Sequence, residues 1–187
     1  MKKTNLFSLV ASLLLLVLSS CSKSGGSGSG TGTCSWSCDI DGVHYSCSGT
    51  YPPTTGSAEQ AIFQQMGGGS AIILLARGNN LNQDQVNFIF EPNPTPGTHN
   101  FNASNSTTSR NAHVMLGASK IYSSMYPGSS INITIPSIPT KSFVSTGSAS
   151  GAGYFKGTFS GTMMNATGSG SINITNGQFE GMVLQND

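Results

Sequence analysis

Three cysteines and one histidine lie close together near the start of the chain, and their side chains are the strongest candidates for chemistry. They are Cys34, Cys38, His44 and Cys47. Thiols in an oxidising compartment form disulfides, and thiolates with imidazole bind zinc, although zinc sites usually have tighter Cys-x-x-Cys spacing. We predict one disulfide that joins Cys47 to either Cys34 or Cys38, with one thiol left over and no metal or other cofactor.

The other two histidines, His99 and His113, are the remaining candidates for catalysis. A catalytic histidine needs an orienting acid and a nucleophile within hydrogen-bond reach. The chain has only seven acidic residues, which show no paired or metal-like spacing, and it has no Gly-x-Ser-x-Gly sequence. We therefore predict a protein that is not an enzyme, and a hydrolase with a site near His99 and His113 is the alternative.

The fourth cysteine, Cys21, follows a segment with the features of an export signal. Two lysines precede an apolar run over residues 6–18, which is too short to span a membrane as a helix. The Leu-Ser-Ser-Cys sequence at its end resembles the lipobox of bacterial lipoproteins. This resemblance implies that residues 1–20 are removed and that Cys21 is acylated. Ser22, in place of the Asp linked to inner-membrane retention, favours the outer membrane, with the domain facing the periplasm or the cell surface.

The composition argues against binding to nucleic acid. Charged residues make up 8% of the 187 residues, about a third of the roughly 25% usual for soluble domains, and the formal net charge is +1. Residues 22–33 are almost entirely Gly, Ser and Thr, so residues 21–33 are expected to form the acylated cysteine and a flexible tether. Its root-mean-square length is roughly 20 Å. A single domain is expected over residues 34–187.

Short apolar stretches separated by turn residues predict that this domain is all-β. We expect a single antiparallel β-barrel or β-sandwich of about ten short strands. One helix is a candidate over residues 57–66, where Ser57 and Gln60 form a capping-box pattern, and a strand is the alternative there. The expected strand segments are residues 34–40, 43–49, 71–77, 86–90, 98–102, 112–116, 121–126, 131–135, 142–145, 154–163, 172–175 and 178–183.

Two hairpins are expected from dipeptides that favour tight two-residue turns. Asp41-Gly42 would close the first, and its register places His44 on the face opposite the cysteines. Asn176-Gly177 would close the second. The expected cross-strand pairs are Ile40 with Val43, Cys38 with Tyr45, Trp36 with Cys47, Ile174 with Phe179, and Ile172 with Gly181.

Glycines interrupt the apolar face of the strand expected over residues 154–163. Gly157 and Gly161 alternate there with Phe155, Phe159 and Met163. Glycine inside a strand is typical of a bend or of the close approach of another backbone. We therefore expect either a bend in this strand or another backbone close to it.

Three segments, in this order and spacing, resemble an uncharacterised group of lipoproteins from Bacteroidota. The segments are residues 40–45 (Ile-Asp-Gly-Val-His-Tyr), residues 96–99 (Pro-Gly-Thr-His), and residues 157–162 followed by residues 174–179 (Gly-Thr-Phe-Ser-Gly-Thr, then Ile-Thr-Asn-Gly-Gln-Phe). The resemblance implies a compact antiparallel β domain of unknown function. It identifies no catalytic residues.

The predicted function is that of a membrane-anchored lipoprotein with a non-enzymatic β domain, acting as a binding or envelope-surface module. The expected ligand is a glycan, a lipid or another envelope protein, and a purely structural envelope subunit is a further alternative. Aromatic side chains are candidates for stacking on a ligand. They are Trp36, Tyr45, Tyr51, Tyr122, Tyr126 and Tyr154, of which Trp36 and Tyr45 fall on the expected core face.

Overall fold

The computed structural model describes residues 32–51, 60–66, 69–77, 84–117, 119–138, 143–144 and 154–185. Within these ranges the protein is all-β, with twelve strands and no helix. The expected signal peptide, Cys21 and most of the tether lie outside them. The first strand begins at Gly32, two residues before the expected start of the domain. Among the described residues there is no helix long and apolar enough to cross a membrane.

The strand bounds agree closely with most of the expected segments. The strands are β1 (Gly32–Ile40), β2 (Val43–Tyr51), β3 (Gln60–Met66), β4 (Ser70–Arg77), β5 (Asp84–Phe90), β6 (Gly97–Asn102), β7 (Asn111–Leu116), β8 (Lys120–Ser123), β9 (Ser130–Ile135), β10 (Phe143–Val144), β11 (Tyr154–Asn165) and β12 (Ser171–Gln185).

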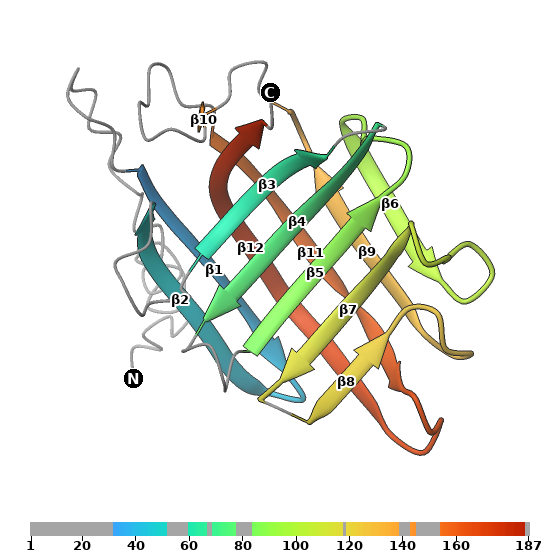
Figure 1. Cartoon of the computed structure of the whole chain (residues 1–187). Coiled ribbons are helices and arrows are strands. Elements are labelled where there is room, and N and C mark those ends of the chain that lie inside the picture. Colours follow the sequence, from blue (N-terminus) through green and yellow to red (C-terminus); the bar gives the residue numbers. More distant parts are fainter. Residues whose placement is uncertain are drawn as a thin grey trace, which may run out of the picture.

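The strands form one strongly curled sheet that folds into two layers whose strands run in crossing directions (Figure 1). The first layer has the order β2-β1-β12-β11-β9-β6, and the second has the order β3-β4-β5-β7-β8. Most pairings are antiparallel, as expected, whereas β12 pairs in parallel with β3 and β10.

The two longest strands, β11 and β12, connect the layers. One edge of β12 pairs first with β1, through residues 174–180, and then with β3, through residues 182–185. One edge of β11 likewise pairs with β9, through residues 158–162, and then with β8, through residues 164–165. Strands that pass from one layer to the other form the corners of an orthogonal β packing.

The hairpin expected at Asp41-Gly42 is confirmed. All three predicted pairs between β1 and β2 are present, including Cys38 opposite Tyr45. Asp41 has φ 50° and Gly42 has φ 79°. Two consecutive residues with positive φ form the turn that suits the right-handed twist of antiparallel strands.

The hairpin expected at Asn176-Gly177 is wrong. Residues 171–185 form one continuous strand, and Asn176, with φ 53°, is the extra residue of a β-bulge. Between successive paired positions here, β1 advances by two residues and β12 by three. The same holds for the pairing of β11 with β12. Asn and Gly tolerate the left-handed conformation that a tight turn and a bulge both need, so the dipeptide does not distinguish the two.

The helix considered over residues 57–66 is also wrong, and the alternative is correct. Gln60–Met66 is strand β3, which pairs with β4 on one side and with β12 on the other. Ala61 and Phe63, two residues apart, are buried in the core. Ile62 between them is buried as well, and pairing on both edges outweighs the local capping pattern.

Phenylalanine rings fill the space between the layers, and glycines in β11 and β12 provide room for them. A Cβ atom on Gly157 would lie 2.4 Å from the carbonyl oxygen of Thr134 and 2.5 Å from Cζ of Phe179. One on Gly161 would lie 2.3 Å from the carbonyl oxygen of Ser130. The expected close approach of another backbone is therefore confirmed. Phenylalanine and glycine alternate as cross-strand partners, in the pairs Phe155 with Gly181, Gly157 with Phe179, and Phe159 with Gly177.

Candidate functional site

The outward face of the first layer carries hydroxyl, amide and charged side chains on all six of its strands. Most of the alternate residues of the same strands point inward and are buried, among them Ile131, Ile133 and Ile135 of β9. We call the outward set the polar face. Its residues are Ser35, Ser37, Asp39, His44, Ser46, Ser48, Thr98, Asn100, Asn102, Ser130, Asn132, Thr134, Lys156, Thr158, Ser160, Thr162, Ser171, Asn173, Thr175, Asn176, Gln178 and Glu180.

One row of uncharged groups crosses the whole polar face, with one residue from each strand. We call it the central row, and in spatial order it is Ser46, Ser37, Gln178, Thr158, Thr134 and Thr98. The amide nitrogen Nε2 of Gln178 donates to Oγ of Ser37 at 3.1 Å. The hydroxyls of Thr98 and Thr134 lie 2.8 Å apart. These bonds hold the side chains in place while leaving further donors and acceptors open to solvent.

Beside the central row, three side chains from three neighbouring strands are joined through Asp39. Nδ1 of His44 lies 2.7 Å from Oδ1 of Asp39, and Nδ2 of Asn176 donates to Oδ2 at 2.7 Å. The hydrogen bond from Asn176, followed by that from His44, lowers the pKa of the Asp39 carboxyl below its ordinary 3.8. Asp39 is therefore a carboxylate at neutral pH. We call these three residues the Asp39 cluster.

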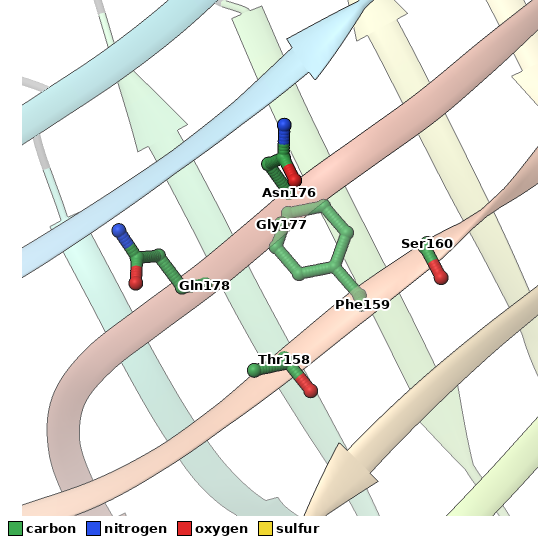
Figure 2. Close-up of a pocket in the computed structure, with 6 residues that line it drawn as sticks. All are labelled: Thr158, Phe159, Ser160, Asn176, Gly177 and Gln178. Carbon is green, nitrogen blue, oxygen red and sulfur yellow. The ribbon is translucent and has the colours of Figure 1, made fainter. Parts of the chain in front are cut away.

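A shallow hollow of about 360 Å³ lies where β11 passes the bulge of β12, and it is open to solvent. Figure 2 shows the residues that line it, which come from these two strands. Asn176 belongs both to the hollow and to the Asp39 cluster, so the two are connected. The lining residues are Thr158, Phe159, Ser160, Asn176, Gly177 and Gln178.

The sequence contained a signal for the Asp39 cluster that our motif reasoning missed. The predicted register of the first hairpin already placed Asp39 opposite His44, and the structure confirms that pairing. The prediction that His44 and the cysteines lie on opposite faces is confirmed as well, since Cys38 is buried and the His44 side chain is 65% exposed. The contribution of Asn176 to the cluster was not predicted, because the Asn176-Gly177 dipeptide favours a hairpin turn and not a position beside Asp39.

His99 and His113 lie on different sides of the protein. His99 points inward from β6. Its ring and that of Phe90 pack in a T-shaped arrangement with their centres 5.3 Å apart, and its Nε2 donates to the carbonyl oxygen of Thr95 at 2.7 Å. His113 points outward from β7 in the second layer, and burial lowers its pKa. Within the described ranges, neither imidazole contacts a carboxylate.

Of the cysteines expected to form a disulfide, only Cys38 and Cys47 have side chains that the structure describes. They are not bonded to each other, and Cys38 is a free, buried thiol. Burial, followed by the negative charge of Asp39, raises the pKa of Cys38 to about 12. A bridge from Cys47 to Cys34 lies outside the described side chains. In the part of the chain that the structure covers, no three His, Cys, Asp or Glu side chains could hold a metal ion.

The described members of the aromatic set considered for stacking do not line the polar face. Trp36 is buried, and Tyr45 and Tyr122 pack against the core. Tyr45 also lies under the guanidinium of Arg77, 4.6 Å from its ring centre. Tyr126 is half-buried in the turn after β8. The side chains of Tyr51 and Tyr154 lie outside the described set.

Together, the fold and this face define an all-β protein with a two-layered, mainly antiparallel sheet and a polar outward surface. Comparison with known protein families, curated proteins and solved structures finds no match for the chain. The function must therefore be argued from the chemistry of the surface.

Proposed function

We propose that the protein is a membrane-anchored lipoprotein whose β domain is a non-enzymatic binding module, with the polar face as its ligand surface. The observation that carries the proposal is the central row, an unbroken line of hydroxyl and amide groups across six strands. Hydroxyls and amides both donate and accept hydrogen bonds, as sugar hydroxyls do. The ligand class that fits best is a neutral glycan.

The charge of the polar face supports this choice of ligand. Only Asp39, Lys156 and Glu180 carry a fixed charge there, and both signs occur. A nucleic acid or a polyanionic glycan would need a cluster of basic groups, because phosphate binding depends on Lys and Arg. The hollow beside Asn176, with amide and hydroxyl groups around it, is the place on this face that we propose for a sugar ring.

Binding is preferred to catalysis because of where the candidate catalytic groups lie. His99 faces the core of the first layer and His113 faces outward from the second, so they do not form one site. The Asp39–His44 pair has the orientation of a histidine held by an acid, but within the described ranges no hydroxyl or thiol contacts the free Nε2 of His44 as a nucleophile would.

The anchor is proposed from the resemblance of residues 18–21 to a lipobox, and Ser22, in place of the Asp linked to inner-membrane retention, supports the outer membrane as its location. The resemblance to the Bacteroidota lipoprotein group is part of the same proposal. The test is Cys21→Ala, which removes the acylated side chain. We expect this variant to leave the membrane fraction or to stay unprocessed, and an unchanged membrane fraction would exclude lipid anchoring through Cys21.

We infer that the domain is a closed barrel flattened into two layers, from which β1–β2 and β9–β6 extend as free edges. The first layer ends at β2 on one side and at β6 on the other, and the described strand order gives neither a second neighbour. The layers join only through β11 and β12. The pairings run in a circuit from β12 through β3, β4, β5, β7, β8 and β11 back to β12, so no pairing by β2 or β6 is needed for closure.

Glycan binding can be tested with the mature chain on an array of neutral and charged polysaccharides. We expect neutral glycans to bind, and Gln178→Ala to weaken binding about fivefold, the effect of losing about 1 kcal/mol of hydrogen bonding. Gln85→Ala is the matched control, because Gln85 is an outward amide on the second layer. Binding to charged glycans alone, or to none, would reject the neutral-glycan ligand, and capture of a protein partner instead would favour the structural alternative.

A further inference from the structure

Strand β2 lies at one end of the first layer and has β1 as its one neighbour in the described strand order (Figure 1). The two-residue turn fixes which backbone groups of β2 bond to β1, because Ile40 and Val43, on either side of that turn, exchange hydrogen bonds. Along an antiparallel pair, every second residue bonds to the partner strand, and the others point their N–H and C=O groups away from it. The groups on the open side of β2 are therefore those of His44, Ser46 and Ser48.

These three residues are open to solvent along the edge of β2. The side chain of His44 is 65% exposed, and Ser46 and Ser48 are exposed as well. Among the residues that the structure describes, none outside β1 hydrogen-bonds to the backbone of these three.

The sequence of β2 does not protect this edge. A bulge, a proline or a charged side chain usually keeps an edge strand from pairing with another chain. The pairing of β2 with β1 is unbroken over nine residues. The sequence of the strand, Val-His-Tyr-Ser-Cys-Ser-Gly-Thr-Tyr, contains no Pro, Asp, Glu, Lys or Arg.

The opposite end of the first layer, at β6, is covered by the chain itself. The N–H of Asn102 donates to Oδ1 of Asn105 at 2.9 Å, and its carbonyl oxygen accepts from the N–H groups of Asn105 and Ser106 at 3.1 and 2.9 Å. The carbonyl oxygen of Asn100 accepts from the guanidinium of Arg110 at 3.3 Å. The residues that follow β6 therefore occupy backbone groups along that edge, whereas no described segment does so along β2.

We propose that β2 pairs with β2 of a second copy of this chain, antiparallel and about a two-fold axis at Ser46. This register places Ser46 opposite its counterpart, and His44 opposite Ser48 of the second copy. Every open backbone group of the three residues then has a partner. The edge favours a second copy as its occupant, because that copy brings an uncharged edge strand with the same free groups at the same spacing. Two-fold pairing is also the commonest form of self-association.

The proposed pairing closes on itself and extends the polar face. The two-fold axis uses the β2 edge of both copies, and the covered β6 edge does not offer a third copy the same contact. Rotation about an axis perpendicular to the sheet keeps both polar faces on the same side. Because Ser46 ends the central row, the two rows would meet at the axis. That longer ligand surface rests on the proposed function, whereas the pairing itself depends on neither the glycan nor the lipid anchor.

Amide hydrogen exchange, followed by NMR at increasing concentrations of the full-length protein in detergent, tests the pairing residue by residue. We expect the amides of His44, Ser46 and Ser48 to exchange more slowly as the concentration rises, because they are hydrogen-bonded only in the dimer. The amides of Tyr45 and Cys47, which bond to β1, should exchange slowly at every concentration. The paired surface is small, so we expect the dimer to dissociate on dilution.

A charge placed at the axis should weaken the dimer. Ser46→Lys sets two ammonium groups on directly opposite strand positions, and we expect the dissociation constant from sedimentation to rise about fivefold. Ser171→Lys is the matched control and should leave this constant unchanged. Ser171 is also an exposed serine of the polar face, but it lies on β12, which is not a neighbour of β2. Circular dichroism of both variants checks that they are folded.

Three outcomes would overturn the proposal. The first is a protein that stays monomeric at every concentration, with the three edge amides exchanging freely. The second is a dimer whose slowed amides lie on other strands. The third is a dimer that Ser46→Lys leaves as stable as Ser171→Lys does. No glycan is present in these measurements, so a failed dimer and a failed glycan array are separate results.

Discussion

Trp36 and Ala76 join the two layers of the sheet through a hydrogen bond of 3.1 Å from the indole Nε1 to the carbonyl oxygen. The bond spans forty residues of sequence and is buried. A backbone carbonyl of β4 is thereby satisfied by a side chain of β1. The contact fixes how the first hairpin sits against the second layer.

Replacing Trp36 with Phe should destabilise the protein by about 1–3 kcal/mol, because the carbonyl of Ala76 would stay buried without its donor. The free energy of unfolding in urea measures the loss. Val43→Ala is the control, since Val43 lies on the same hairpin and is 59% exposed. A loss below about 0.5 kcal/mol for Trp36→Phe would show that the carbonyl finds another donor.

Gly157→Ala should cost about 2–3 kcal/mol, since the new methyl group would overlap both the Thr134 carbonyl and the Phe179 ring. Urea unfolding again gives the value. The neighbouring Thr158→Ala, on the outward face, should cost less than about 1 kcal/mol. Equal costs at the two positions would contradict the close approach of β9 and the ring.

Asp39 should make stability depend on pH at the acid end. Its pKa is lowered in the folded protein, so its contribution is complete above the ordinary value of 3.8 and disappears as pH falls through the lowered value. Asp39→Asn should flatten the fall in thermal midpoint between pH 5 and pH 2. In the control variant Ser37→Ala, the thermal midpoint should change with pH as steeply as in the unaltered protein. An identical slope in Asp39→Asn would refute the role of this carboxyl.

His113 should affect stability at higher pH. Burial lowers its pKa from 6.5 in the folded protein, so the unfolded chain binds protons more readily, and stability falls as pH drops below 6.5 through the lowered value. His113→Gln should remove this dependence, whereas Gln85→Ala on the same face should retain it. Thermal midpoints between pH 8 and pH 5 would reveal the difference.

The cysteines can be assigned by mass spectrometry of unreduced peptides. We expect Cys47 linked to Cys34, because the bond between Cys38 and Cys47 is not formed in the structure. With a pKa of about 12, roughly one Cys38 thiol in ten thousand is ionised at pH 8, so alkylation should require unfolding. A Cys38–Cys47 peptide, or three thiols alkylated in the folded protein, would disprove this assignment.

The two turn dipeptides show what sequence reasoning could and could not reach. Asp41-Gly42 joins β1 directly to β2, and in the described strand order β2 has β1 as its one neighbour, so local chemistry and alternation were sufficient to predict every cross-strand pair in this hairpin. Asn176-Gly177 has the same local chemistry, but β1 and β11 pair with the two edges of β12 on both sides of this dipeptide. That long-range pairing decides between a turn and a bulge, and nothing within a few residues of Asn176 reveals it.

In the candidate site, too, local sequence predicted some neighbours, and long-range strand pairing determined the others. The pairing of Asp39 with His44 followed from a register that the sequence predicted. The central row did not, because it brings together residues as far apart in sequence as Ser37 and Gln178 through a strand order that alternation alone cannot supply. Alternation predicted which residues face outward on each strand, and the order of the strands determined which of them became neighbours.

The position of β12 also bears on when this protein can fold. It is the last of the described strands, yet it pairs with β1, β3 and β11 and connects both layers. Until residues 171–185 have been made, β1 lacks its inner neighbour and the corner at β3 stays open. A chain emerging from the ribosome, or passing through a translocation channel, therefore remains incomplete until very late. That delay would suit a protein that has to cross a membrane before it folds.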